Sequence, residues 1–307
     1  MLNDIQKHIL EIVSGMAADA QGAVNIRANG KRAYHSNCEG VRIESKTDKE
    51  GIDIIIDPGV KADHVYIPVV VTEEGFHDVV YNDFFIGEGA VVTINAGCGI
   101  HNCGSCDSEH DGIHTFHVGK NAVVTYSEVH YGEGEGEGKR ILNPQTILYL
   151  EEGARVTLES TQIRGVDDTK RYTKAVLKGE NAEFIVQEKL LTHGDQKADS
   201  VMDVFLDGDN SSCRVISRSV AQDESTQTFY PRVVGNTACF GHVQCDSIIM
   251  GKAKVRSIPE ISCNHVDAGL IHEAAIGKIA GDQILKLQTL GLSYEEAEEK
   301  ILEGFLR

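Results

Sequence analysis

A cysteine, a histidine and a glutamate near the C-terminal end are the first candidates for chemistry. Glu273 follows Cys245 by 28 residues and has His272 immediately before it. A thiolate, an imidazole and a carboxylate can together ligate a transition metal. Taken alone, a cysteine in a strand is most often a core residue, and a His–Glu pair at a helix start often only caps or charges the helix. The spacing by itself leaves a ligand set and a structural role open.

The second candidate is a glycine-rich stretch that contains three cysteines. Cys98, Cys103 and Cys106 form a C-x4-C-x2-C pattern, which is like that of plant-type ferredoxins. Thiolates on such a loop can converge on one soft metal, although a fourth ligand would have to come from a distant part of the chain. The pattern favours metal or sulfur chemistry over a structural role, and the ligand types do not exclude zinc as the metal. The histidines close to these cysteines are His101, His110, His114 and His117.

The composition disfavours several classes of function. The 307 residues carry a formal net charge of −18, so the phosphates of nucleic acids and of anionic membranes would be repelled. The opening residues lack the cationic start of a signal peptide, and no apolar run is long enough to cross a membrane. We therefore expect a cytoplasmic protein with reduced thiols, no nucleic-acid partner and no membrane partner. Core positions or incidental thiols are expected for Cys38, Cys213, Cys239 and Cys263.

An internal repeat supplies the elements that must position these residues. Six segments share an apolar residue, a turn with glycine or asparagine and an alternating strand, and they begin at residues 56, 86, 118, 150, 177 and 206. Such a period is typical of a stacked β-solenoid whose corners need a left-handed residue. We predict a mainly β solenoid in preference to an antiparallel β-sandwich. On a period near 30 residues, Cys245 and Glu273 lie about one coil apart and could be stacked on one edge.

Helical patterns flank the repeat. Residues 2–14 have the apolar spacing of a helix. Helical character returns after Glu273, where Gly291 ends one helix and Ser293 opens another with a capping box. The predicted organisation is an N-terminal helical segment (1–33), a β-helix core (34–262) and a C-terminal helical segment (263–307). The GEGEGEGK run at 132–139 lacks the strand–loop–helix context of a phosphate loop, so nucleotide binding is not expected.

The C-terminal motifs resemble those of the SufB/SufD family, the scaffold components of the SUF iron–sulfur cluster assembly machinery. The most specific of them are QCDSIIMG (244–251), IPEI (258–261), HEAAIGKIAGDQILKLQTLGLS (272–293) and EEAEEKILEGF (295–305). The upstream ILNPQT, the coil LLTHGDQKADSVMDVFLDG and the glycine-cornered repeats are similar too, so the resemblance covers roughly residues 35–307. It implies a right-handed parallel β-helix with a short N-terminal helix and a C-terminal helical segment.

The resemblance also implies a function and partners. The chain would be a scaffold, not an enzyme, on which an iron–sulfur cluster, with [4Fe–4S] favoured, is built and transferred. The implied partners are a SufC-like ATPase that binds the C-terminal helices, a second copy of the chain in a homodimer, and apo iron–sulfur proteins or carriers that receive the cluster. Cys245 of QCDS and Glu273 of HEA match positions implicated in holding the nascent cluster. Further candidate ligands or sulfur acceptors are His272, Cys98, Cys103 and Cys106.

This sequence departs from familiar SufB proteins in three ways. It is much shorter and resembles a minimal SufB-like protein of a two-component SufBC-type system. The coil at 150–162 has no cysteine near where SufB carries a sulfur-accepting thiol, and the Cys98–Cys106 stretch is not shared by familiar SufB sequences. The alternative functions are a stable iron–sulfur or zinc protein built on the C-x4-C-x2-C stretch, and a carbohydrate-active β-helix enzyme, which an aromatic content of 6% disfavours.

Overall fold

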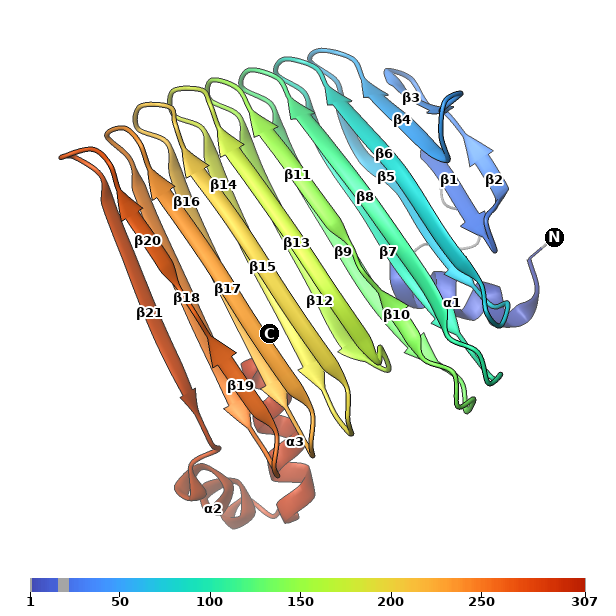
Figure 1. The fold of residues 1–307 in the computed structure, drawn as a ribbon, viewed down its shortest axis with the longest axis vertical. Helices are drawn as coiled ribbons and strands as arrows, with labels where there is room; N and C mark the ends of the chain where they lie inside the picture. The colour runs from blue at the N-terminus through green and yellow to red at the C-terminus, as the bar shows by residue number, and fades with distance from the viewer. Residues whose placement is uncertain (1, 16–21, 307) are drawn as a thin grey trace.

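The chain winds into a solenoid whose successive coils stack side by side (Figure 1). The structure, a computed structural model, describes residues 2–15 and 22–306. It has about eight turns, and 58% of the residues are in strands. Neighbouring strands within the solenoid run parallel, so the predicted β-solenoid is confirmed and the antiparallel sandwich is not formed.

The strands form two facing sheets, here called sheet A and sheet B. The ten strands of sheet A are β1 (Ala23–Ala28), β2 (Lys31–Ser36), β5 (Lys61–Val71), β7 (Val91–His101), β9 (Val123–Glu133), β12 (Arg155–Arg164), β14 (Glu183–Thr192), β16 (Ser212–Ala221), β18 (Phe240–Ile249) and β21 (Gly269–Gly277). The eleven strands of sheet B are β3 (Val41–Ser45), β4 (Gly51–Ile56), β6 (His77–Ile86), β8 (Ser108–Val118), β10 (Arg140–Leu142), β11 (Gln145–Leu150), β13 (Asp168–Leu177), β15 (Lys197–Leu206), β17 (Thr226–Gly235), β19 (Lys254–Ser257) and β20 (Glu260–Cys263). Sheet A runs in the order β2-β1-β5-β7-β9-β12-β14-β16-β18-β21.

The corners from sheet B into sheet A use the residues that the repeat predicts. The φ angles of six corner residues lie between 55° and 70°, and these residues are Gly59, Gly89, Asn121, Gly153, Asn181 and Asn210. Glycine and asparagine tolerate this left-handed conformation better than other residues. Each corner amide donates to a carbonyl of the next coil, as Asn121 does to Glu152 at 2.8 Å. The corner prediction is therefore confirmed.

Alternate side chains of each strand fill the space between the sheets. In the half of each coil next to the glycine corners the filling is apolar. Phe84 and Phe116 stack there with ring centres 4.0 Å apart, and Tyr126 meets Phe116 edge-on at 4.9 Å. The other half contains an apolar cluster around Val71 and Ile100 in the first coils, and buried polar side chains such as His130 and Glu188 in later ones, and these lead to the candidate functional residues.

The two ends of the solenoid are built differently. At the N-terminal end, the antiparallel pairs β1–β2 and β3–β4 terminate the sheets, and helix α1 (Asp4–Ser14) packs on β5, β7 and β9. At the C-terminal end, β21 is the last strand of sheet A, and its outer edge has no strand partner among the described residues. An edge strand of this kind presents free backbone groups for pairing with another chain.

The helical segments start and end at different places from those expected. The C-terminal hairpin of α2 (Gly281–Thr289) and α3 (Tyr294–Phe305) is confirmed, including the capping box at Ser293. Helical character directly after Glu273 is wrong, because residues 269–277 form β21 and pair with β18, which outweighs their local preference. The segment 1–33 contains α1 but also β1 and the start of β2. None of the helices in the described ranges is both long and apolar enough to span a bilayer.

Candidate functional site

Cys245 and His272 lie side by side near the C-terminal end of the solenoid. Cys245 is on β18, points inward and is 3% exposed. His272 is on β21 and lies opposite Val243 of β18. Val243 and Cys245 are two residues apart on one strand and share the inner face, so His272 is on that face too. The Sγ of Cys245 is 3.5 Å from the Nε2 of His272. This thiol and this imidazole can contact one common metal ion.

The surroundings keep both groups neutral near pH 7. Burial raises the pKa of the Cys245 thiol to about 11, and the Glu188 carboxylate acts in the same direction. Burial, helped by the nearby imidazole of His242, lowers the pKa of His272. The thiol therefore stays protonated and poorly nucleophilic until a metal ion displaces its proton.

Glu273 is on the same strand as His272 but points the opposite way. Its side chain is 65% exposed on the outer face of sheet A, where its Oε2 lies 3.5 Å from the Nε2 of His242. Cys245 and Glu273 are one coil apart, but they lie on opposite faces of neighbouring strands, so the expected stacking on one edge does not occur. The sequence analysis missed His242. It lies three residues before Cys245 on the same strand, so alternation alone predicts that its side chain points outward.

Cys98 does not belong to a loop. It lies within β7, points inward and is 7% exposed, and burial raises the pKa of its thiol well above the ordinary value. The glycines on either side face α1. A Cβ at Gly97 would be 2.2 Å from the carbonyl oxygen of Val13, and one at Gly99 would be 2.0 Å from the Cγ2 of Ile9. These glycines allow a helix to lie against the sheet, and they do not shape a metal-binding loop.

Cys103 and Cys106 lie in the exposed turn between β7 and β8. The Glu74 carboxylate holds this turn by accepting hydrogen bonds from the backbone N–H groups of Ser105 and Cys106 at 2.6 and 3.0 Å. In the described parts of the chain, the three thiols do not form a group whose ligand atoms all lie within 4.8 Å of one another. The structure thus does not bring Cys98, Cys103 and Cys106 together as a ferredoxin-like set.

Cys103 instead contacts a histidine that a carboxylate orients. The Sγ of Cys103 is 3.1 Å from the Nε2 of His101, whose Nδ1 is 3.1 Å from the Oε1 of Glu133. The Tyr131 hydroxyl donates to the other oxygen of Glu133 at 2.8 Å. Burial alone would raise the pKa of Glu133, but the hydrogen bonds from Tyr131 and His101 outweigh it and lower the pKa. A thiol, an imidazole and an ionised carboxylate in this order form the arrangement that activates a nucleophilic cysteine.

The two thiol sites are far apart within one chain. β7 and β18 both belong to sheet A, with β9, β12, β14 and β16 between them. Five strand spacings of about 4.8 Å separate the two strands by about 24 Å. The Cys103 turn and Cys245 therefore cannot ligate the same metal ion within one chain.

A row of buried polar side chains runs through the solenoid between the two regions. Its members are Asp78, His110, His114, Tyr126, Glu128, His130, Arg171, Glu188, Ser200 and Ser217. Sequence analysis missed this row as a unit. The row could have been recognised from strand alternation, because residues 126, 128 and 130 follow the buried Val124 at every second position and therefore also point inward.

Linked charges occupy the centre of this row. Arg171 donates to Glu188 at 2.7 Å and to the Nδ1 of His130 at 3.0 Å. The Nε2 of His130 is 3.5 Å from Glu128. Burial opposes ionisation of Glu128, but the adjacent histidines and Arg171 outweigh it and hold its pKa below the usual range. A cavity of about 20 Å³ is lined both by Glu188 of the row and by Cys245.

Comparison with known proteins identifies the family. The family model for the SUF system FeS cluster assembly SufBD core domain matches residues 70–305. The chain belongs to the SufBD family. The SufBD match contains both the Cys103 turn and the Cys245 site.

Several archaeal proteins named as iron–sulfur cluster assembly SufBD family proteins are similar over most of this SufBD chain. The protein of Methanocaldococcus jannaschii is 26% identical over 272 residues, which cover 87% of this chain and 85% of the relative. The protein of Pyrococcus horikoshii is 27% identical over 275 residues, with 87% and 81% covered. The protein of Archaeoglobus fulgidus is 28% identical over 277 residues, with 87% and 71% covered. The family resemblance seen in the sequence is therefore confirmed.

Proposed function

We propose that this SufBD protein is a homodimeric scaffold on which an iron–sulfur cluster is assembled with a SufC-like ATPase and then passed to an apo-protein or carrier. The observation that carries the proposal is the contact between the buried Cys245 and the half-buried His272, which lies on the edge strand β21, whose outer edge has no strand partner in the described ranges. A ligand pair inside a closed core would be inaccessible. At this edge the thiol is buried, whereas the imidazole of His272 is half-buried on the last strand of the sheet.

The ligand chemistry suits cargo that must later leave. The Cys245 thiol would lose its proton to the incoming iron, and His272 would supply a neutral imidazole. Glu273 and His242 lie on the outer face of sheet A. They would supply further ligands there, either to the cluster of their own chain or to that of the second subunit. Thiolate binds iron firmly, whereas imidazole and carboxylate exchange more readily, so a mixed set holds a cluster without trapping it.

The C-terminal end supports self-association. The bare edge of β21 can pair with the same strand of a second copy, which would place two Cys245–His272 pairs near one another. Exposed apolar side chains gather on the last coils, where a second copy would cover them. These residues are Ile258, Ile261, Val266, Ile271 and Ile276.

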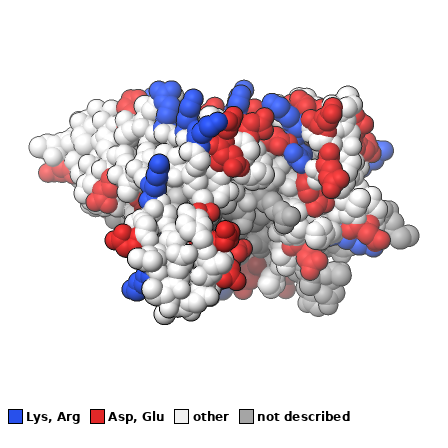
Figure 2. Space-filling view, turned by 90° about the horizontal axis from the view of Figure 1, so that it is seen from below, with Lys and Arg blue, Asp and Glu red and all other residues white. Residues whose placement is uncertain are grey.

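The α2–α3 hairpin is the proposed ATPase contact. It projects from the solenoid (Figure 1), and Leu285, Leu290 and Tyr294 expose 62%, 75% and 53% of their surfaces on it. Figure 2 shows acidic side chains on both flanks of this projection, while most Lys and Arg side chains in that view lie along the opposite edge. An apolar centre with an acidic surround fits a partner that has a basic rim.

The Cys103 turn is the proposed point of sulfur entry. His101 would accept the thiol proton, and the Cys103 thiolate would attack the outer sulfur of a donor persulfide, R–S–SH. The donor S–S bond breaks, a new S–S bond forms on Cys103, and the departing R–S⁻ takes the proton from His101. No net oxidation occurs. The proposal gives Cys106 and the buried Cys98 the role of further acceptors along the route.

Anaerobic reconstitution with ferrous iron and sulfide tests the cluster site. Wild type should bind iron and sulfide with thiolate-to-iron absorption, whereas Cys245→Ala and His272→Ala should lose most of both. Cys213→Ala is the matched control, because Cys213 is a buried thiol on the neighbouring strand β16. Equal iron and sulfide content in all four proteins would contradict the assignment.

Mass spectrometry after incubation with a persulfide donor tests the sulfur route separately. Cys103 should gain one sulfur faster than Cys106, and His101→Gln should remove the difference. Tight metal retention that is abolished by Cys103→Ser, without any effect of Cys245→Ala, would instead favour a stable iron–sulfur or zinc protein.

A further inference from the structure

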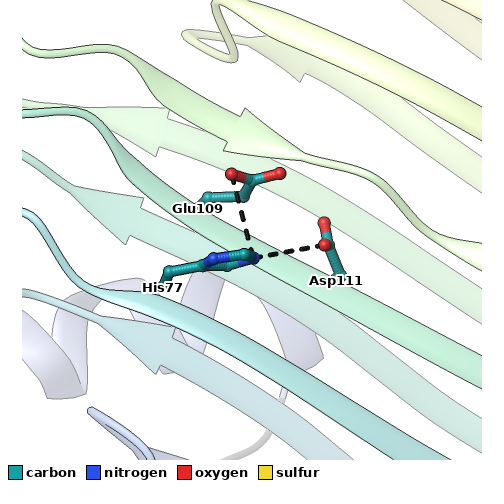
Figure 3. Close-up of side chains that lie close together, drawn as sticks. All are labelled: His77, Glu109 and Asp111. Carbon is teal, nitrogen blue, oxygen red and sulfur yellow. Dashed lines mark hydrogen bonds and ion pairs between the residues drawn. The ribbon is translucent and has the colours of Figure 1, made fainter.

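One histidine and two carboxylates converge on the outer face of sheet B, and none of the three belongs to either thiol site. The Nε2 of His77 is 3.3 Å from the Oδ2 of Asp111 and 3.8 Å from the Oε2 of Glu109. One ligand atom from each residue lies within 4.8 Å of the others. Figure 3 shows both carboxylates directed at the same ring nitrogen. The three side chains thus surround a point that a single ion could occupy.

The strand register creates this arrangement. His77 on β6 lies opposite Glu109 on β8, and Val79 lies opposite Asp111. Glu109 and Asp111 are two residues apart on one strand, so they share a face, and the imidazole of His77 reaches across to both. The positions are on regular strands, which hold ligands more firmly than a loop would.

The carboxylates are only partly satisfied by the protein. In the part of the chain that the structure describes, the ion pairs of Glu109 and Asp111 are both with His77, and no Lys or Arg pairs with either. The Nδ2 of Asn143 donates to Glu109 at 2.8 Å and fixes that side chain. The Oδ1 of Asp111 is a buried oxygen that lacks a hydrogen-bond partner. A buried, unpaired carboxylate oxygen is costly unless a cation satisfies it.

We propose that His77, Glu109 and Asp111 form a binding site for a divalent first-row transition-metal ion. One imidazole and two carboxylates are the borderline-to-hard set that Mn²⁺, Fe²⁺ and Zn²⁺ accept. Soft Cu⁺ prefers sulfur, and Mg²⁺ and Ca²⁺ prefer oxygen ligands alone. The side chain of His77 is 56% exposed, that of Glu109 30% and that of Asp111 22%. An ion held here would keep positions open to water and could be released.

The site lies near the Cys103–Cys106 turn. β7 leads into the Cys103–Cys106 turn, and β8, which carries Glu109 and Asp111, leads out of it. The residue two positions before His77 is Gly75, and a Cβ on it would be 3.4 Å from the Cβ of Cys106. A metal ion at this site would therefore lie close to the exposed thiols. We take Fe²⁺ as the natural ion, and this choice rests on the proposed function, whereas the existence of the site does not.

Titration with Mn²⁺ under anaerobic conditions, followed by electron paramagnetic resonance, tests the site. Mn²⁺ avoids thiolates, so the signal of bound ion reports oxygen and nitrogen ligands and not the cysteines. Wild type should bind one ion per chain. His77→Gln and Asp111→Asn should each weaken binding by at least about tenfold, because each removes a ligand.

The matched control is Asp83→Asn on β6, which removes the same charge from the same sheet. Asp83 pairs with Lys46 at 2.7 Å and has no part in the proposed site. The affinity of this variant should equal that of wild type. If Asp83→Asn weakens binding as much as Asp111→Asn does, the acidic surface binds Mn²⁺ diffusely and the proposal is wrong. Unchanged affinity in His77→Gln would equally overturn it, because His77 would then only form an ion pair with the two carboxylates. Displacement of the bound Mn²⁺ by Fe²⁺ would show that the site accepts Fe²⁺, and failure of Fe²⁺ to displace it would contradict the choice of Fe²⁺ as the natural ion.

Discussion

The substitution Glu188→Gln should destabilise the interior of the solenoid far more than an equivalent change at the surface. Glu188 is 3% exposed and accepts hydrogen bonds from Arg171, Ser200 and Ser217 at 2.7, 3.0 and 2.8 Å. Glutamine keeps the size but removes the charge that compensates the buried guanidinium. Breaking one partner of a buried ion pair costs about 3–5 kcal/mol in free energy of unfolding. That is the loss we expect.

A second substitution should recover much of this loss. Arg171 is 6% exposed, so in Glu188→Gln its guanidinium loses the carboxylate that it contacts directly. In the double variant Glu188→Gln/Arg171→Met neither charge remains, and such replacements are often close to neutral in stability. The double variant should therefore be more stable than Glu188→Gln alone by at least about 2 kcal/mol, a strong coupling for residues in direct contact.

Denaturant unfolding followed by circular dichroism measures these differences. The matched control is Glu152→Gln, which removes a surface ion pair with Lys120 at 3.0 Å whose side chains are 55% and 54% exposed. Its cost should be at most about 1 kcal/mol. Because a solenoid can unfold coil by coil, hydrogen exchange in β13 and β14 would locate the loss. The reasoning is refuted if Glu188→Gln and the control Glu152→Gln have the same free energy of unfolding. It is also refuted if the double variant is no more stable than Glu188→Gln alone.

Three further outcomes follow from the packing and the charges. Gly99→Val should detach α1, because its Cβ would lie 2.0 Å from the Cγ2 of Ile9; faster proteolysis and hydrogen exchange at residues 4–14 would show this, and unchanged protection would contradict it. Alkylation of Cys245 at pH 7 should be about 100-fold slower than that of an ordinary thiol, because its pKa of about 11 lies two pH units above the ordinary 9.0; a rate equal to that of Cys106 would contradict this. Interactions with Arg27 and His110 outweigh burial and lower the pKa of Asp78. The stability that this carboxylate contributes is present above its unfolded pKa of 3.8 and is lost as the pH falls below that value. The free energy of unfolding should therefore fall less steeply with decreasing pH in Asp78→Asn than in wild type, and equal slopes would contradict this.

Local chemistry determined the repeat. A corner residue with positive φ is a property of a few consecutive residues, because the Cβ clash that excludes most side chains arises within the backbone itself. The glycines and asparagines at 59, 89, 121, 153, 181 and 210 therefore reveal the coils without knowledge of any distant contact. The capping box at Ser293 is equally local, since both of its hydrogen bonds span three residues.

Only the tertiary structure decided which candidate residues meet. The path of residues 274–277 depends on β18, which offers a strand to pair with, and the sequence alone favoured a helix there. Cys245 and Glu273 are one coil apart, as the repeat predicts, but a strand reverses its side-chain direction at every residue, so register alone set His272 beside the thiol and Glu273 outside. Register likewise set His101 beside Glu133, whereas the turn after β7 brings Cys103 to His101 and away from the inward-pointing Cys98. Spacing along the chain predicts how many coils separate two residues. The register between coils decides whether their side chains lie on the same face of the sheet, and only side chains on the same face can bind one ligand together.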